Sequence, residues 1–238
     1  MKQVVSRRKI IYLSTVFIIS TLVFSINSII FLPASSMEVD TKKRIIVLDA
    51  GHGGEDGGAV SKSGIVEKDL NLAITMKIKE KLEDNNIQVI LTRDNDVMLY
   101  TNAEAKLAKR KVEDINKRID ITNSANADML VSIHMNSFPQ NYCKGWQIFF
   151  KQDNDASKEI ASFIEKSIKE ELIDNNNRVA QSINNVKLIN KSQIPAIVVE
   201  CGFLSNDEEA NMLTEESYQE KISTGICNGI MKWYNNQQ

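Results

Sequence analysis

Short apolar runs recur along most of the chain, and five of them have the length and the β-branched content of buried strands. They lie at residues 44–49, 87–92, 129–133, 146–150 and 196–200. Between and after these runs, apolar residues recur every three or four positions, which is typical of amphipathic helices. We expect such helices within residues 70–82, 94–126, 160–172, 207–213 and 216–234. Strands that alternate with helices predict a layered α/β domain.

The N-terminal region follows a different pattern. Residues 10–32 are mostly apolar and uncharged, and four basic residues precede them: Lys2, Arg7, Arg8 and Lys9. A helix of this length spans roughly 34 Å, which exceeds a hydrocarbon core of about 30 Å. The basic cluster predicts a cytoplasmic N-terminus. The small residues at 34–36 also suit a signal-peptidase site, so an uncleaved anchor and a cleaved signal peptide are both open.

The predicted organisation has three parts. Residues 1–36 are expected to form a cytoplasmic basic stub with a signal anchor or signal peptide, residues 37–42 a short linker, and residues 43–238 one catalytic domain. No internal repeat or linker rich in Pro, Gly and Ser divides that domain. The domain is expected outside the cytoplasm, where it is either attached to the membrane through residues 10–32 or secreted.

Charge and cysteine content narrow the function further. The chain has 29 basic and 31 acidic residues, and four of the basic ones precede residue 37, so residues 37–238 carry a formal net charge of −6. Such a surface argues against nucleic-acid binding and against general electrostatic capture by anionic polymers. Cys143, Cys201 and Cys227 are an odd number without a CxxC pair, so a disulfide framework or a zinc ribbon has little support.

The chain has two histidines, and each stands at the end of an apolar run. His52 follows the run 44–49 in a Gly-rich loop, and His134 follows the run 129–133. Groups at the carboxyl ends of strands line the ligand crevice of an α/β sheet, so we expect both imidazoles in one site. Glu67 lies just before a predicted helix, where its carboxylate can turn back toward His52. Two imidazoles and one carboxylate are a known ligand set of catalytic zinc, although each residue alone also suits a structural role.

Glu200 is an acidic residue in apolar surroundings. It ends the run 197–199 and is followed by Cys201 and Gly202. Such surroundings disfavour the ionised carboxylate and raise its pKa. A raised pKa suits a group that takes a proton from water and passes it to a leaving group. An ion pair with a lysine or arginine is the alternative that the sequence leaves open.

These candidate residues belong to four ordered motifs. They are DAGHGGEDGGA at 49–59, Glu67 before a helix, SIHMNS at 132–137 and VECGFLSN at 199–206. Together they closely resemble the motifs of the zinc-dependent N-acetylmuramoyl-L-alanine amidases of the Amidase_3 type. The resemblance runs from about residue 43 to residue 235, which is almost the whole predicted domain.

The resemblance implies a single three-layer α/β domain with a mixed, mainly parallel sheet. It implies His52, Glu67 and His134 as ligands of one Zn²⁺ ion, and Glu200 as the catalytic base and acid. The implied substrate is peptidoglycan, and the implied reaction is hydrolysis of the amide between N-acetylmuramic acid and the L-alanine of the stem peptide. Asp56 is expected to orient His52 by accepting its other imidazole N–H.

The single domain without wall-binding repeats most resembles the spore-cortex amidases of endospore formers, which act with a deacetylase to form muramic-δ-lactam. This subtype implies action in the forespore intermembrane space or cortex, with an accessory or activating protein. A vegetative cell-wall amidase is the alternative. Residues 100–113 look like an insertion, here named the inserted segment. An added helix in this part of some family members blocks the site, so autoinhibition or partner docking is a hypothesis for this segment.

Three other functions compete with this one. A cysteine peptidase would use Cys201 and His134, but Cys201 lies in an apolar strand rather than at an electropositive helix start. A dinucleotide-binding protein needs a third glycine where the chain has Asp56. A non-catalytic or partner-dependent peptidoglycan-binding module is harder to dismiss, although binding alone would not require Glu200.

Overall fold

The strands form one six-stranded sheet. The computed structural model describes residues 43–173 and 176–237. The strands are β1 (Ile45–Ala50), β2 (Gln88–Leu91), β3 (Met129–Asn136), β4 (Gln147–Lys151), β5 (Gln181–Ile183) and β6 (Ala196–Phe203). Their order is β2-β1-β3-β6-β4-β5, and every neighbouring pair is parallel except β4 and β6. The prediction of a mixed, mainly parallel sheet is confirmed.

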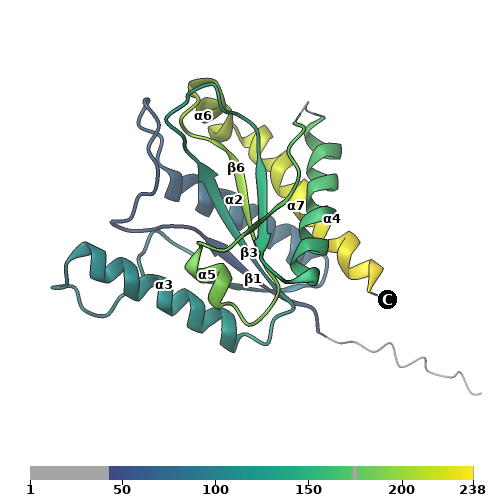
Figure 1. Ribbon diagram of the computed structural model, residues 1–238, viewed down its shortest axis with the longest axis horizontal. Coiled ribbons are helices and arrows are strands. Elements are labelled where there is room, and N and C mark those ends of the chain that lie inside the picture. The colour runs from purple at the N-terminus through teal and green to yellow at the C-terminus, as the bar shows by residue number, and fades with distance from the viewer. Residues whose placement is uncertain (1–42, 174–175, 238) are drawn as a thin grey trace, which may run out of the picture. The chain divides into compact units, whose positions relative to one another are not determined.

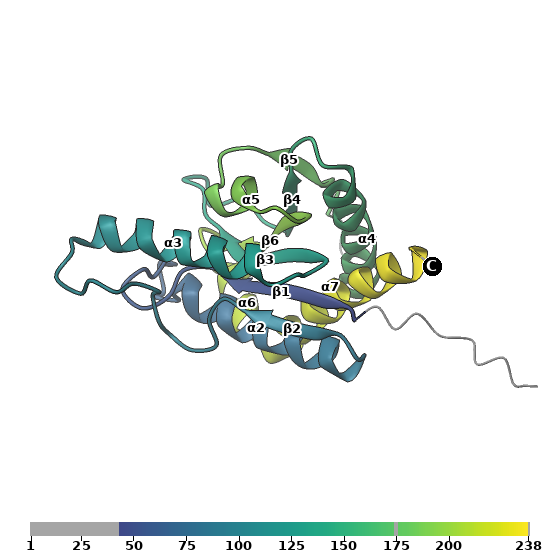
Figure 2. The same cartoon turned by 90° about the horizontal axis from the view of Figure 1, so that it is seen from below.

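Helices cover both faces of this sheet. They are α2 (Glu67–Asp84), α3 (Leu107–Ser124), α4 (Asp155–Leu172), α5 (Lys187–Lys191), α6 (Asp207–Thr214) and α7 (Glu216–Asn236). Figures 1 and 2 show α2, α4 and α7 on one face and α3 and α5 on the other, with α6 near the carboxyl end of β6. The predicted three-layer α/β arrangement is therefore confirmed.

The alternation of side chains along the central strands divides the core in two. Ile133 packs into the larger cluster, which lies under α2, α4 and α7. Leu130 and Val198 pack into a smaller cluster under α3 and α5. Because successive strand residues point to opposite faces, His134 and Glu200 lie on the face of this smaller cluster. Two of the predicted site residues, His134 and Glu200, therefore lie on the face that α3 and α5 cover.

The helix expected within residues 94–126 begins only at Leu107. The chain before it forms turns whose N–H groups bind side chains of α3. The N–H of Leu99 donates to Asp114 at 2.7 Å, and the N–H of Thr101 donates to Glu113 at 2.9 Å. The apolar pattern also does not predict β5 and α5, because one has three residues and the other five.

The expected membrane segment at residues 10–32, with the basic stub and the linker, lies outside the described residues. Within the part that the structure describes, no helix is both long enough and apolar enough to cross a membrane. The organisation proposed for residues 1–42 stays a prediction.

A buried ion pair lies at the carboxyl end of β1. Asp49 is 1% exposed and accepts hydrogen bonds from Arg118, Thr92 and Ser132, each at 2.6 Å. Arg118 of α3 also donates to the carbonyl oxygen of His52 at 2.6 Å. The network joins β1 and β3 to α3, and it fixes the start of the loop that follows β1.

Asp49→Asn is expected to lower the free energy of unfolding by about 3–5 kcal/mol, because it leaves the Arg118 charge buried without its partner. Burial opposes ionisation of Asp49, but Arg118 and the neighbouring hydrogen bonds outweigh it and lower its pKa to about 2. Because the folded-state pKa is lowered, this stabilisation is complete above about pH 4 and is lost as the pH falls toward 2. Urea unfolding at pH 7 and at several values between pH 4 and pH 2 measures both effects.

The exposed Asp94 offers a matched control, since Asp94→Asn removes a carboxylate that takes part in no ion pair among the described residues. That variant should unfold like the wild type at every pH. Wild-type stability of Asp49→Asn at pH 7, or an unchanged loss of stability on acidification, would contradict the role of the pair.

Candidate functional site

His52, Glu67 and His134 come together at the carboxyl end of the parallel strands. His52 follows β1 in a left-handed backbone conformation with φ 62°, Glu67 is the first residue of α2, and His134 lies in β3. One potential ligand atom from each residue lies within 4.8 Å of the other two. The structure thus brings together the three residues that the sequence singles out as a metal site.

Glu67 stands between the two imidazoles. Its Oε1 lies 3.4 Å from Nε2 of His52 and 3.0 Å from Nδ1 of His134. Ligand atoms at about 2.0–2.2 Å from a tetrahedral zinc ion are about 3.3 Å from one another. The donor set and its spacing therefore fit a zinc ion.

Backbone donors hold the Glu67 carboxylate in place. Its Oε1 accepts the N–H of Met135 at 3.1 Å, and its Oε2 accepts the N–H of Ala59 at 2.8 Å. Burial opposes ionisation of Glu67, but hydrogen bonds from the imidazoles outweigh it and hold the pKa well below its usual range. Burial also disfavours the charged form of His134, but Glu67 outweighs this effect and raises the pKa of His134 to about 8. The cluster therefore stabilises positive charge, as a cation site must.

Two glycines leave the space that these side chains occupy. A Cβ atom at Gly51 would lie 2.2 Å from Nε2 of His134, which is a severe overlap. A Cβ atom at Gly58 would lie 2.5 Å from Oε2 of Glu67. Gly58 also has a φ of 71°, which glycine adopts without strain. Both positions therefore require glycine for the site to keep its geometry.

Glu200 lies beside His134 on the neighbouring strand. The two residues are register partners in the parallel pair of β3 and β6. Oε2 of Glu200 is buried and has no hydrogen-bond partner among the described residues. Burial raises the pKa of Glu200 to about 7, against the opposing effect of His134. A carboxyl group with such a pKa can accept and release a proton near neutral pH.

Charged residues of α3 hold the loop that carries His52. Oδ2 of Asp56 lies 3.1 Å from Nδ1 of His52, and Nζ of Lys111 lies 2.6 Å from the other oxygen of Asp56. Arg110 forms a two-pronged pair with Glu55, at 2.6 and 2.5 Å. The inserted segment therefore contacts the loop that carries His52, and its role in autoinhibition or partner docking stays a prediction.

The sequence pattern does not single out three supporting residues, Asn71, Arg93 and Arg118. Asn71 and Arg93 both donate to the carbonyl oxygen of Gly51, each at 3.0 Å. Arg118 binds the carbonyl oxygen of His52, as described above. These bonds fix the backbone from which His52 projects. Arg93 lies two residues after the end of β2. Its position at the carboxyl end of a strand is the feature of the sequence that could have marked it as a site residue.

Cys201 points away from the site. It is fully buried in the larger core cluster, whereas His134 lies on the opposite face of the sheet. Burial raises the pKa of the Cys201 thiol well above its usual value, so the thiolate is strongly disfavoured. A cysteine peptidase that uses Cys201 and His134 is therefore excluded.

Comparison with known proteins identifies the family of this chain. Residues 46–232 match the Amidase_3 family, described as N-acetylmuramoyl-L-alanine amidase. The germination-specific N-acetylmuramoyl-L-alanine amidase of Bacillus subtilis (strain 168) is 33% identical over 191 residues, which cover 80% of each chain.

Solved structures agree with this match. The CwlD amidase from Clostridioides difficile, in complex with the GerS lipoprotein, has a TM-score of 0.80 and 40% identity, covering 82% of this chain and 100% of that chain. An N-acetylmuramoyl-L-alanine amidase from Clostridium difficile 630 has a TM-score of 0.72 and 30% identity, covering 82% of this chain and 99% of that chain. The chain therefore belongs to the Amidase_3 family and is an N-acetylmuramoyl-L-alanine amidase that acts on peptidoglycan.

Proposed function

We propose that the amidase reaction of this chain depends on one Zn²⁺ ion and on Glu200. The observation that carries the proposal is the grouping of His52, Glu67 and His134 beside the buried, unpartnered oxygen of Glu200. The two imidazoles and the Glu67 carboxylate would hold the ion. Zinc, when bound, supplies a Lewis acid that polarises the scissile carbonyl and activates water.

Glu200 carries out both proton transfers in this proposal. Its carboxylate accepts a proton from the attacking water, and the same group later donates a proton to the amine of the departing L-alanine. Both forms of the side chain are populated near neutral pH because burial raises its pKa to about 7. The hydrogen bonds to Glu67 and to the loop that carries His52 keep the ligands in one geometry before the substrate arrives.

Product analysis tests the zinc dependence. The purified chain is incubated with peptidoglycan with and without zinc, and the soluble products are identified by mass spectrometry. We expect stem peptides that begin with a free L-alanine amine, and we expect their release to stop on chelation and to resume when zinc is added back. Undiminished release in the presence of a strong chelator would exclude a metal-dependent reaction.

We further propose a role in maturation of the spore cortex. The support is the similarity to the germination-specific relative and to the CwlD amidase. Removal of the stem peptide frees the lactyl carboxyl group. Once a deacetylase has freed the sugar amine, condensation of the two groups with loss of water gives muramic-δ-lactam. The chain would act outside the cytoplasm, in the forespore intermembrane space or cortex.

An accessory or activating protein is part of this proposal, because the CwlD relative was solved in complex with a lipoprotein. The cortex role is tested in spores that lack the chain, where muramic-δ-lactam should be missing from the cortex muropeptides. A normal lactam content in those spores would instead favour a vegetative cell-wall amidase.

Asp56→Asn is expected to lower the zinc affinity about ten- to a hundredfold, because a neutral amide orients the His52 imidazole less well than a carboxylate. Competition with a chromophoric chelator measures this affinity. Asp84→Asn, which changes an exposed residue at the end of α2, is the matched control and should leave the affinity unchanged. Equal affinities of Asp56→Asn and the wild type would rule out the orienting role.

A further inference from the structure

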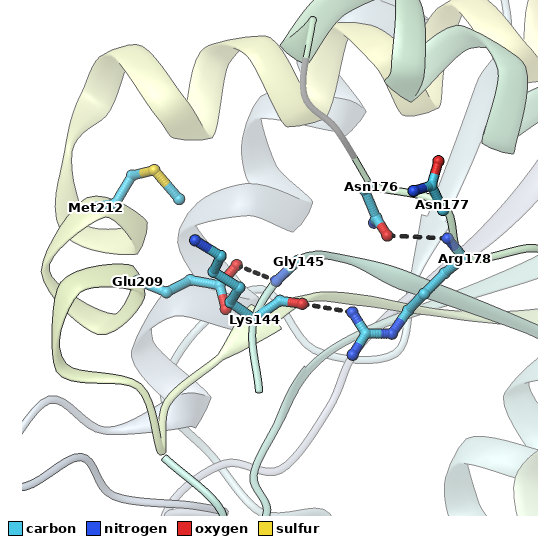
Figure 3. Close-up of a pocket in the computed structure, with 7 residues that line it drawn as sticks. All are labelled: Lys144, Gly145, Asn176, Asn177, Arg178, Glu209 and Met212. Carbon is cyan, nitrogen blue, oxygen red and sulfur yellow. Dashed lines mark hydrogen bonds between the residues drawn. The ribbon is translucent and has the colours of Figure 1, made fainter. Parts of the chain in front are cut away.

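A cavity of about 720 Å³ lies outside the candidate metal centre. Three segments line it: residues 144–145 before β4, residues 176–178 before β5, and Glu209 and Met212 of α6. Figure 3 shows these segments around one space, with Arg178 on one side and the side chains of α6 on the other. None of these residues belongs to the proposed reaction machinery.

The cavity lies within reach of a peptide bound at Glu200. Gly145 is two residues from Gln147, which is the register partner of Glu200 in the antiparallel pair of β4 and β6. With about 3.4 Å per residue along a strand and about 4.8 Å between strands, the backbones of Gly145 and Glu200 are about 8 Å apart. From the first to the third residue an extended peptide spans two steps, about 7 Å, and a long side chain on the third residue reaches several ångströms further. A stem peptide whose first residue lies at Glu200 can therefore bring its third residue to the cavity.

The wall of the cavity carries two positively charged side chains, Lys144 and Arg178, against one carboxylate, Glu209. Within the described ranges, neither Lys144 nor Arg178 takes part in an ion pair. Arg178 donates through Nη1 to the carbonyl oxygen of Lys144, and its guanidinium stacks over the Phe203 ring at 5.0 Å. These contacts fix the guanidinium, and its other N–H groups have no acceptor among the described residues.

Glu209 contributes one carboxylate to the wall, which offsets only one of the two positive charges. It is 5% exposed, and its two oxygens accept the N–H groups of Gly145 at 2.7 Å and Phe203 at 2.8 Å. Its acceptor groups are therefore used to join β4, β6 and α6. Gly145 has a φ of 89°, and a Cβ atom there would lie 3.2 Å from Asn176 and 3.3 Å from Arg178. A glycine at this position keeps the wall open.

We infer that this cavity binds a carboxylate carried by the third residue of the stem peptide. The inference rests on the proposed reaction, because it takes Glu200 as the position of the first residue. The third residue of stem peptides is commonly lysine or the dicarboxylic diaminopimelic acid, and these differ by one carboxylate at the end of the side chain. Arg178 pairs with that carboxylate, Lys144 adds positive charge from the α6 side of the cavity, and Met212 packs against the aliphatic chain that carries the carboxylate.

Two tripeptides test this assignment. They are N-acetyl-L-Ala-γ-D-Glu-diaminopimelate and N-acetyl-L-Ala-γ-D-Glu-L-Lys, in which acetylation prevents the amine from chelating metal. Their affinities are measured by titration calorimetry with the zinc-loaded full chain carrying Glu200→Gln, so that the ligand is not consumed. We expect the diaminopimelate peptide to bind about fivefold more tightly, as for a partly exposed ion pair.

Lys144→Gln and Arg178→Gln, each added to that chain, should remove most of this preference. Lys158→Gln, which changes an exposed lysine of α4, is the matched control and should retain it. Arg178 also packs on Phe203, so thermal unfolding is recorded, and the exposed Lys144 provides the variant that leaves the fold intact. Equal binding of the two peptides, or an unchanged preference in Lys144→Gln, would overturn the inference. Failure of the proposed reaction would appear separately, as stem-peptide release that persists in Glu200→Gln or in the presence of a strong chelator.

Discussion

Glu200→Gln should lower the rate of stem-peptide release by about a thousandfold, within the range that general acid–base catalysis contributes. The amide keeps the shape of the side chain but can neither accept the proton from water nor deliver one to the leaving amine. The zinc affinity and the thermal unfolding temperature should stay close to those of the wild type, because Glu200 is not one of the proposed ligands and its Oε2 makes no hydrogen bond among the described residues. Release is measured by chromatography of the soluble peptides at saturating zinc.

Glu80→Gln is the matched control for this variant, since Glu80 is an exposed residue of α2 that makes no ion pair in the described part of the chain. It should retain the full rate. A folded, zinc-loaded Glu200→Gln chain that works within tenfold of the wild type would show that another group transfers the proton.

His52→Asn should lower the zinc affinity by more than about a hundredfold, which exceeds the usual effect of a residue that only supports a ligand. Asparagine suits this position because it tolerates the left-handed backbone that the φ of 62° requires. The free energy of unfolding without metal should therefore change little, and the loss can be assigned to the missing imidazole. Chelator competition gives the affinity, and urea unfolding gives the stability.

The rate of the same variant should depend on zinc concentration. Activity lost at micromolar zinc should recover in part when zinc is raised, because the remaining ligands, Glu67 and His134, still bind weakly. A variant that binds zinc as tightly as the wild type would remove His52 from the ligand set. A variant that unfolds would instead show that His52 has a structural role.

The sequence predicts five of the six strands and the places of the histidines because both depend on strong local signals. The β-branched runs are unambiguous, and a residue directly after such a run lies at the carboxyl end of a strand. The true lengths of β3 and β6 are less predictable. Both continue past their apolar runs, to Asn136 and Phe203, because the ladder between them extends where polar side chains face the site.

The hydrogen bonds that hold the backbone around His52 could not be predicted, since they join distant segments of the chain. Asn71 and Arg93 hold the carbonyl oxygen of Gly51 from different elements, and neither belongs to a periodic pattern. The contacts of the inserted segment were equally unpredictable. Its charges suggest an exposed helix, yet Arg110 and Lys111 bind acidic residues that lie 55 positions earlier in the chain.

Gly51 and Gly58 help to distinguish active relatives from those that have lost catalysis. Inactive members of enzyme families are usually sought by checking whether the reacting side chains are present. Here a relative could keep both histidines and both glutamates and still be inactive, because a methyl group at position 51 would occupy the space of the His134 ring. Gly51 and Gly58 therefore belong among the positions that distinguish a working amidase from a relative that has lost catalysis.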